Sequence, residues 1–193
     1  MDNRIDSVLR YWEELGPQGW YKGSAEIDAA LRSRFEPLWH EARRTGLQPR
    51  DATAEGALAR LLVLDQFPRN IFRNRPESFA TDALALQAAI RAIGHGQDLL
   101  IAPPLRQFFY MPLMHAEDLM AQTHCVVLFE ERMPGDSIRH ARAHREVIAQ
   151  FGRFPWRNAV LSRPSTAEEI AFLEAGGYAH ALGAIPPLRV VPN

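Results

Sequence analysis

The sequence has only one cysteine, Cys125, among its 193 residues. An internal disulfide bond is therefore excluded, which is typical of a reducing compartment. No segment approaches the roughly 20 consecutive apolar residues that a membrane-spanning helix needs. The N-terminus also lacks the apolar core of a secretory signal peptide. Together these absences predict a soluble, cytoplasmic protein.

The sequence also has no strong excess of positive or of negative charge. The formal net charge is −1, and hydrophobic and charged residues make up 47% and 23% of the chain, as in ordinary globular proteins. Without a global electrostatic field, we expect neither nucleic acid nor a membrane surface as a partner. The length predicts one domain over residues 1–193, with its core in 5–176. The oligomeric state stays open.

Several motifs that identify enzymes are absent. The sequence has no glycine-rich phosphate loop, no G-x-S-x-G elbow, no paired C-x-x-C and no H-E-x-x-H. His140 and His144 are spaced for one helix face, but no third ligand shares their spacing, so we expect no metal and no cofactor. Cys125 precedes the apolar run 126–129, which indicates a buried hydrophobe rather than a nucleophile.

Helical periodicity is what the chain has in abundance. Apolar residues recur at helical spacing in segments that cover residues 5–15, 24–46, 53–68, 81–96, 115–132, 136–151 and 165–176. No segment shows sustained strand alternation, and the helical spacing around residues 126–129 outweighs a short strand there. We therefore predict an all-α fold, a bundle or a stack of helical hairpins.

Glycine and proline mark the expected ends of these helices. Gly16 and Pro17 should stop the first helix, and Pro37 should kink or split the second. Pro68 should end the third. The chain after Gly176, residues 177–193, is predicted to be an extended tail.

The first candidate site is the segment 64–70, Leu-Asp-Gln-Phe-Pro-Arg-Asn. Asp65 continues the apolar stripe and lies in a last helical turn, where the helix dipole disfavours an anion by ~0.3–1 kcal/mol. It needs a cationic partner, either Arg69 or Arg157. Asp65 then either forms a buried pair that fixes the turn or faces a ligand, with Gln66 and Asn70 beside it.

Two histidines are candidates for proton transfer. His115 precedes Glu117 and Asp118 near an expected helix N-terminus, a setting that either tunes a catalytic histidine or only caps the helix. His144 falls on an apolar stripe. It is a core residue, a catalyst or a ligand.

The third candidate is an arginine-rich turn. Arg153, Arg157 and Asn158 belong to the segment 153–158, which resembles 67–70 in its Phe-Pro and Arg-Asn pairs. The turn leads to Arg163 and the helix start at Ser165 and Thr166. It could bind an anion, or the arginines could pair with acids while Glu168 and Glu169 help cap the helix. If the two Phe-Pro turns pack as neighbours, their arginines converge.

These motifs together resemble a bacterial family, domain-of-unknown-function family 924. The resemblance covers residues 7–175 and rests on the ordered segments 64–73, 79–82, 112–117, 151–158 and 165–169. It implies stacked antiparallel helix pairs related to the tetratricopeptide-repeat superfamily, and it transfers no catalytic assignment. Ala116 stands where the family usually has serine, and Trp156 where it usually has histidine. A binding role tolerates these changes more easily than a shared chemistry.

The pattern favours binding of a small anionic ligand or peptide carboxylate in a polar pocket between helices. A hydrolase with a histidine base and an arginine clamp is one alternative. A protein-interaction scaffold is another. The candidate catalytic residues are His115, Glu117 and His144. The candidate ligand-binding residues are Asp65, Gln66, Arg69, Asn70, His115, Arg153, Arg157 and Asn158.

Overall fold

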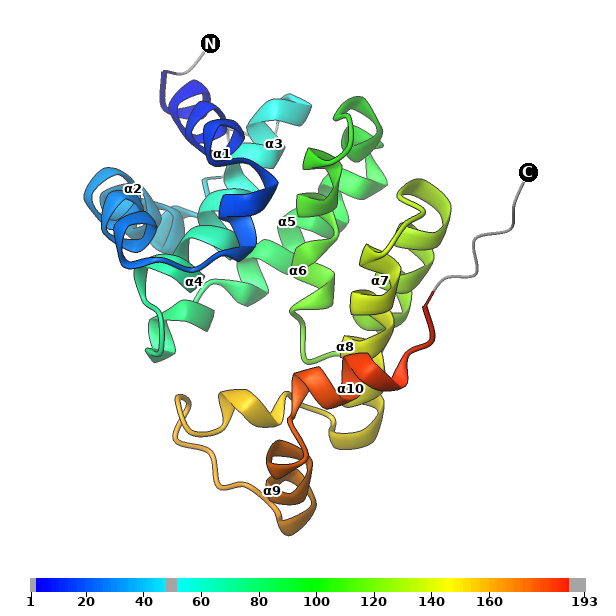
Figure 1. The fold of residues 1–193 in the computed structure, drawn as a ribbon. Coiled ribbons are helices and arrows are strands. Elements are labelled where there is room, and N and C mark those ends of the chain that lie inside the picture. Colours follow the sequence, from blue (N-terminus) through cyan, green and yellow to red (C-terminus); the bar gives the residue numbers. More distant parts are fainter. Residues whose placement is uncertain (1–2, 48–51, 188–193) are drawn as a thin grey trace. The chain divides into compact units, whose positions relative to one another are not determined.

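The computed structural model describes residues 3–47 and 52–187, and these ranges contain helices and no strand (Figure 1). The all-α prediction is confirmed. The α-helices are α1 (Asn3–Tyr21), α2 (Ala25–Thr45), α3 (Ala54–Leu61), α4 (Phe67–Ile71), α5 (Asp82–Gly94), α6 (Met111–Met114), α7 (Leu119–Arg132), α8 (Ser137–Phe151), α9 (Ala167–Glu174) and α10 (Tyr178–Ala184). Short turns link them, namely η2 (Leu62–Gln66), η3 (Pro76–Phe79), η4 (Gln97–Leu100), η5 (Leu105–Phe109) and η6 (Pro155–Arg157). Within the described ranges, no helix is both long and apolar enough to cross a membrane.

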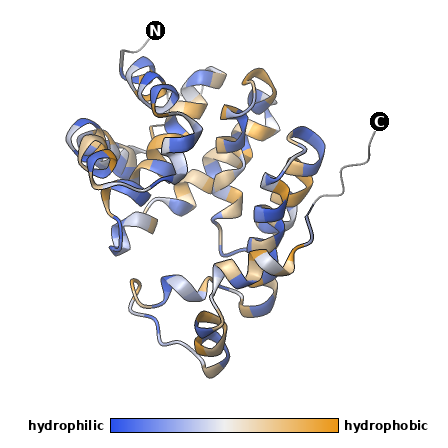
Figure 2. Ribbon diagram, in the orientation of Figure 1, coloured by the Kyte–Doolittle hydropathy of each residue, from blue (hydrophilic) through white to orange (hydrophobic). Residues whose placement is uncertain are grey.

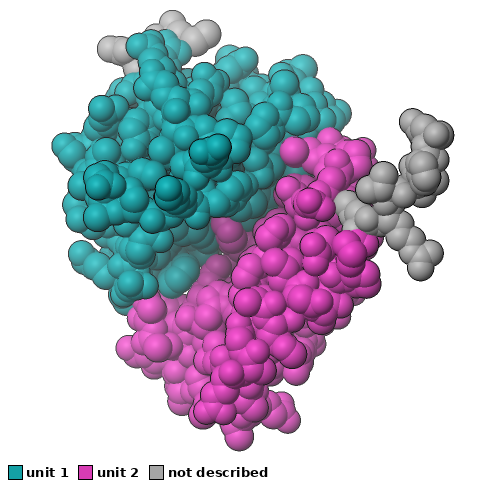
Figure 3. Space-filling view, in the orientation of Figure 1, with its two compact units in different colours: residues 1–112 teal, residues 113–193 magenta. Residues whose placement is uncertain are grey.

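The chain groups into two compact units, which Figure 3 colours separately. We call residues 1–112 the N-terminal unit and residues 113–193 the C-terminal unit. Each unit is described by itself below. One domain over residues 1–193 stays a prediction.

Aromatic side chains form the centre of the N-terminal unit. Trp12 of α1 is fully buried, and its ring centroid lies 5.7 Å from that of Phe67 and 5.4 Å from that of Phe108. Phe67 also packs against Phe35 of α2 at 4.9 Å. Rings from three helices and from η5 therefore hold this unit together. The helices carry apolar and polar residues on different faces (Figure 2), as burial of one helix face requires.

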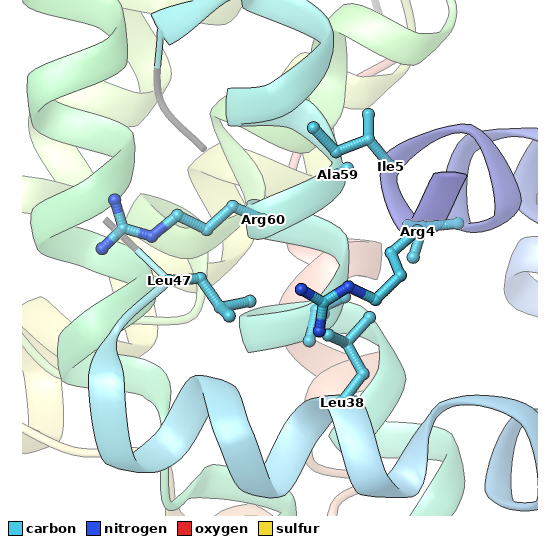
Figure 4. Close-up of a pocket in the computed structure, with 8 residues that line it drawn as sticks. Arg4, Ile5, Leu38, Leu47, Ala59 and Arg60 are labelled. Atoms are coloured by element: carbon cyan, nitrogen blue, oxygen red, sulfur yellow. The ribbon is translucent and has the colours of Figure 1, made fainter. Parts of the chain in front are cut away.

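A buried arginine lies inside this unit. Arg60 of α3 is 2% exposed. It borders a cavity of about 10 Å³ that Arg4, Leu38 and Leu47 also line (Figure 4). A space of this size holds at most about one water molecule, so we assign it no ligand.

The first two helices follow the predicted signals in part. Gly16 has φ +64°, so the helical path breaks there as predicted, but Pro17 starts a further turn that continues α1 to Tyr21. The predicted stop is therefore a kink. Ser24 caps α2 as expected, and α2 passes through Pro37 as one element up to Gly46.

The predicted end at Pro68 is wrong, because the chain changes its helical period there. Residues 62–66 form the π-helical turn η2, in which the Phe67 N–H donates to the Leu62 carbonyl. Pro68 then lies in the first turn of α4, where a missing N–H costs little. The Leu64 carbonyl, four residues before Pro68, accepts instead from the Thr81 hydroxyl at 2.5 Å.

In the C-terminal unit, α7 packs against α8, and α10 packs against α8 as well (Figure 1). The helix expected from residue 115 starts only at Leu119, because Asp118 caps it by accepting from the Ala121 N–H at 2.7 Å. His115 and Asp118 therefore do not share a helix face. Residues 126–129 are helical.

The predicted tail 177–193 is wrong over residues 178–184, which form α10, whereas Ile185 after it is extended. Tyr178 packs on His144 with ring centroids 4.8 Å apart, and this contact with α8 explains why the segment folds. Residues 188–193 lie outside the described residues.

Candidate functional site

In the N-terminal unit, Arg69 forms ion pairs with two carboxylates, those of Asp65 and Asp82. Asp65 is 1% exposed, and its Oδ1 lies 3.2 Å from Arg69 Nη1. Arg69 Nη2 lies 3.0 Å from Asp82 Oδ1. Burial alone lowers the pKa of Arg69, but the two carboxylates outweigh it and raise that pKa. This geometry is that of the predicted buried pair that fixes a turn.

The neighbouring polar residues also bond within the turn. Gln66 donates to the Asp65 carboxylate, and Asn70 donates to the Gln66 carbonyl at 3.0 Å. Arg69 donates to the Asp65 carbonyl at 2.6 Å. The side chains of Arg69 and Asn70 therefore donate to backbone carbonyls of η2, where the chain changes from α-helix to π-helix. A ligand role for Asp65, Gln66, Arg69 and Asn70 stays a prediction.

In the C-terminal unit, Glu117 is held by Arg163. Arg163 Nη1 lies 2.6 Å from Oε2, and Nη2 lies 2.9 Å from Oε1. The Phe154 N–H also donates to Oε1 at 2.8 Å. Burial raises the pKa of Glu117, but the hydrogen bonds from Arg163 and Phe154 outweigh it and lower that pKa. Glu117 is thus an ionised anchor rather than a proton donor.

The sequence did not predict this pairing. Arg163 was recognised only as one of three arginines in its region, and it lies 46 residues from Glu117. Arg163 also donates from Nε to Asn158 Oδ1 at 3.0 Å. This bond connects Arg163 to the segment 153–158.

Arg153 and Glu169 form a second pair. Arg153 Nε lies 2.6 Å from Oε1 and Nη2 lies 2.8 Å from Oε2. The hydrogen bonds from Arg153 are the largest of several effects that lower the pKa of Glu169 to about 2. Glu169 also completes the capping box of α9 with Thr166, and Asn158 donates to it at 3.2 Å. The start of α9 is thus capped by the chain itself.

His144 has a defined protonation pattern. Its Nδ1 lies 2.8 Å from the His140 carbonyl. A carbonyl only accepts, so Nδ1 carries the hydrogen and Nε2 of the neutral ring has a free lone pair. Burial is the largest of the effects that lower the pKa of His144 to about 3, and His115 and Arg157 contribute to the lowering. His144 is therefore neutral at physiological pH, with Nε2 as an acceptor.

Aromatic rings surround this histidine. The centroid of the His144 ring lies 5.5 Å from Phe154, 6.0 Å from Trp156 and 4.8 Å from Tyr178. Tyr178 is hydrogen-bonded to His140. The sequence missed Tyr178, because it placed that residue in a tail.

His115 and Arg157 complete the group, which we call the histidine cluster (His115, His144, Phe154, Trp156, Arg157 and Tyr178). The two imidazole centroids lie 6.4 Å apart, and neither ring is fully buried. Arg157 donates to the His115 carbonyl at 2.9 Å, and its guanidinium lies 4.7 Å from the Phe154 centroid. The structure thus brings His115, His144 and Arg157 together.

The predicted residues divide between the units. Asp65, Gln66, Arg69 and Asn70 belong to the N-terminal unit, whereas His115, Glu117, His144, Arg153, Arg157 and Asn158 belong to the C-terminal unit. Convergence of the two Phe-Pro turns stays a prediction.

Comparisons with known proteins agree with the sequence motifs. The model of the family described as "Bacterial protein of unknown function (DUF924)" matches residues 8–177. The chain belongs to this family. The solved structure of a protein of unknown function from Agrobacterium tumefaciens, ATU0120, is 40% identical with a TM-score of 0.86, over 89% of this chain and 97% of that one. A comparison with curated proteins gives no match.

Ala116 and Trp156, the two positions that the resemblance marks as unusual, lie in or beside the histidine cluster. Trp156 stacks on Phe154 with centroids 4.8 Å apart, and Ala116 is buried. The indole of Trp156 supplies an apolar wall and has no lone pair to offer as a base.

Proposed function

We propose that the protein binds a small anion that also carries a hydrogen-bond donor, at the histidine cluster. The observation that supports this most is the neutral His144 ring, whose Nε2 is an acceptor within the field of the Arg157 guanidinium. A ligand that matches both groups has a negative charge for Arg157 and an O–H or N–H for Nε2.

The arginine in the histidine cluster supports an anion. The Arg157 guanidinium lies 4.7 Å from the Phe154 centroid, and its positive charge acts on His144. A guanidinium beside a hydrogen-bond acceptor attracts an anion, and the attraction is strongest at low ionic strength.

The depressed pKa of His144 favours binding over hydrolysis. A general base works best when its pKa is near the working pH, and that of His144 is about 3. Such a ring accepts a hydrogen bond well but takes up a proton poorly. A hydrolase remains the second candidate because the His115 ring, 6.4 Å away, is only half-buried.

The test compares two matched probes, glycolate and acetate, by isothermal titration and thermal shift. Both are carboxylates of similar size, but only glycolate has a hydroxyl donor. We expect glycolate to bind about tenfold more tightly, because one hydrogen bond contributes about 0.5–1.5 kcal/mol. His144→Asn keeps an N–H for the His140 carbonyl and removes the Nε2 acceptor, so it should abolish the difference.

His124→Asn, on the exposed face of α7, is the matched control and should preserve the preference. Equal affinity for glycolate and acetate in the unmodified protein contradicts the proposal. So does a preference that survives His144→Asn. Turnover of an ester substrate that is lost in His115→Asn would instead favour the hydrolase.

A further inference from the structure

The N-terminal unit contains a second cavity, which none of the candidate site residues above lines. Its volume is about 550 Å³, which falls within the ~300–1,000 Å³ of small-molecule sites. The start of α3 supplies one wall and the end of α5 with η4 supplies the other, since α3 and α5 pack against each other (Figure 1). The lining residues are Ala52, Thr53, Ala54, Glu55, Arg91, Ala92, His95, Gln97 and Leu100.

This cavity offers both signs of charge. Glu55 of α3 and Arg91 of α5 both line it, and both side chains are exposed. Over the described ranges of the chain, no ion pair involves either side chain. A ligand could therefore pair with both side chains. Its anionic group would complement Arg91, and its cationic group would complement Glu55.

The helix end on the α3 wall adds to the preference for a carboxylate. Thr53 caps α3 and accepts from the Gly56 N–H, whereas the first N–H groups of a helix have no partner within the helix. The dipole of that end favours an anion. A carboxylate near Arg91 and Ala54 would therefore meet donors from both walls.

The part of the cavity that η4 lines is suited to an apolar group. Leu100 of η4 is 75% exposed, and covering it with a ligand side chain would remove apolar area from water. His95 also lines the cavity, with Nδ1 2.7 Å from the Arg91 carbonyl. Its ring can therefore report on what enters the cavity.

From this arrangement we propose that the cavity binds a free amino acid with an apolar side chain. The carboxylate faces Arg91 and the start of α3, the ammonium group faces Glu55, and the side chain covers Leu100. This site is independent of the histidine cluster, and its ligand class differs.

The probe is L-leucine, followed through the imidazole NMR signals of His95 in the full chain, with His95→Asn to assign them. We expect leucine to shift these signals. N-acetyl-L-leucine lacks the ammonium group and L-leucinamide lacks the carboxylate, so each should bind at least about tenfold more weakly, as expected when a charged hydrogen bond is lost.

Arg91→Gln and Glu55→Gln should each weaken leucine binding to a similar extent. Both positions are exposed, so these variants should stay folded, which circular dichroism checks. Arg10→Gln, on the exposed surface of α1, should bind like the unmodified protein. His144→Asn should leave leucine binding unchanged, which separates this proposal from the glycolate site.

No shift of the His95 signals with leucine overturns the proposal. Equal shifts with leucine and both derivatives overturn it as well, because they would indicate contact through the side chain alone. Unchanged binding in Arg91→Gln contradicts the assigned role of the guanidinium.

Discussion

At the residue scale, Thr81 explains why a proline is tolerated inside a buried helical segment. Its hydroxyl donates to the Leu64 carbonyl, which Pro68 leaves without an α-helical donor, and it accepts from Trp39 Nε1 at 3.2 Å. The side chain is fully buried. One hydroxyl therefore satisfies two interior groups, from η2 and from α2.

Thr81→Val keeps the shape and removes the hydroxyl. We expect the free energy of unfolding to fall by about 2 kcal/mol, because a buried carbonyl and a buried indole N–H are left unsatisfied. Chemical denaturation measures this loss. Thr123→Val is the control, since the Thr123 hydroxyl bonds the Leu119 carbonyl at the surface and its loss should change stability by less than ~0.5 kcal/mol. Equal losses in the two variants would refute this account.

At the element scale, the ends of helices depend on backbone conformation as well as on apolar periodicity. The helix end at residue 151 and the helix start at Ser165 and Thr166 were predicted, and α8 does end at Phe151 while Thr166 caps α9. The continuation of α4 through Pro68 was not predicted, because a single π-helical turn leaves no mark in the apolar spacing. The start of α7 was misplaced for a related reason. His115 and Asp118 can both cap a helix, and only Asp118 does so.

Substitution of Gly152 tests the role of backbone conformation at the end of α8. It has φ +69°, and a Cβ added there would meet nothing within 4 Å, so substitution costs only backbone strain. We expect Gly152→Ala to destabilise the protein by about 1 kcal/mol. Gly94→Ala is the matched control, because space is open there too and φ lies outside the left-handed region. It should leave the thermal midpoint unchanged or slightly higher, and a drop equal to that of Gly152→Ala would contradict this explanation.

At the scale of the whole molecule, the net charge of −1 hides strong local pairing. Most of the predicted ligand-binding arginines neutralise buried or half-buried acids of their own unit. Glu169, the partner of Arg153, and Glu117, the partner of Arg163, have lowered pKa values, and so has His144. All three groups bind protons more weakly in the folded chain than in the unfolded one.

Acid should therefore destabilise the protein in two stages. The pKa of His144 falls from 6.5 to about 3 on folding, so its contribution is complete above pH ~6.5 and decreases as the pH falls toward the folded value. The two glutamates add a further loss below pH ~4.3, which for Glu169 continues to about pH 2. For His144 the slope should stay below ~1.4 kcal/mol per pH unit, because the ring is partly exposed.

Urea unfolding at a series of pH values measures these stages. His144→Asn should reduce the slope between pH ~6.5 and ~4.5 and leave the lower stage in place, while His140, whose pKa burial also lowers, keeps its own contribution. His124→Asn should follow the unmodified protein. An unchanged slope in His144→Asn would show that another group accounts for the first stage.

The sequence by itself determined the helical class, most helix ends and the family, because apolar spacing and capping residues act over a few positions of the chain. It also selected residues that the C-terminal unit does bring together. The tertiary structure decided which partner each charge has. Arg163 rather than Arg157 holds Glu117, and Asp82 shares Arg69 with Asp65, because such pairs depend on distances across many residues. The folding of residues 178–184 onto His144 was decided at the same level, through packing that no local pattern encodes.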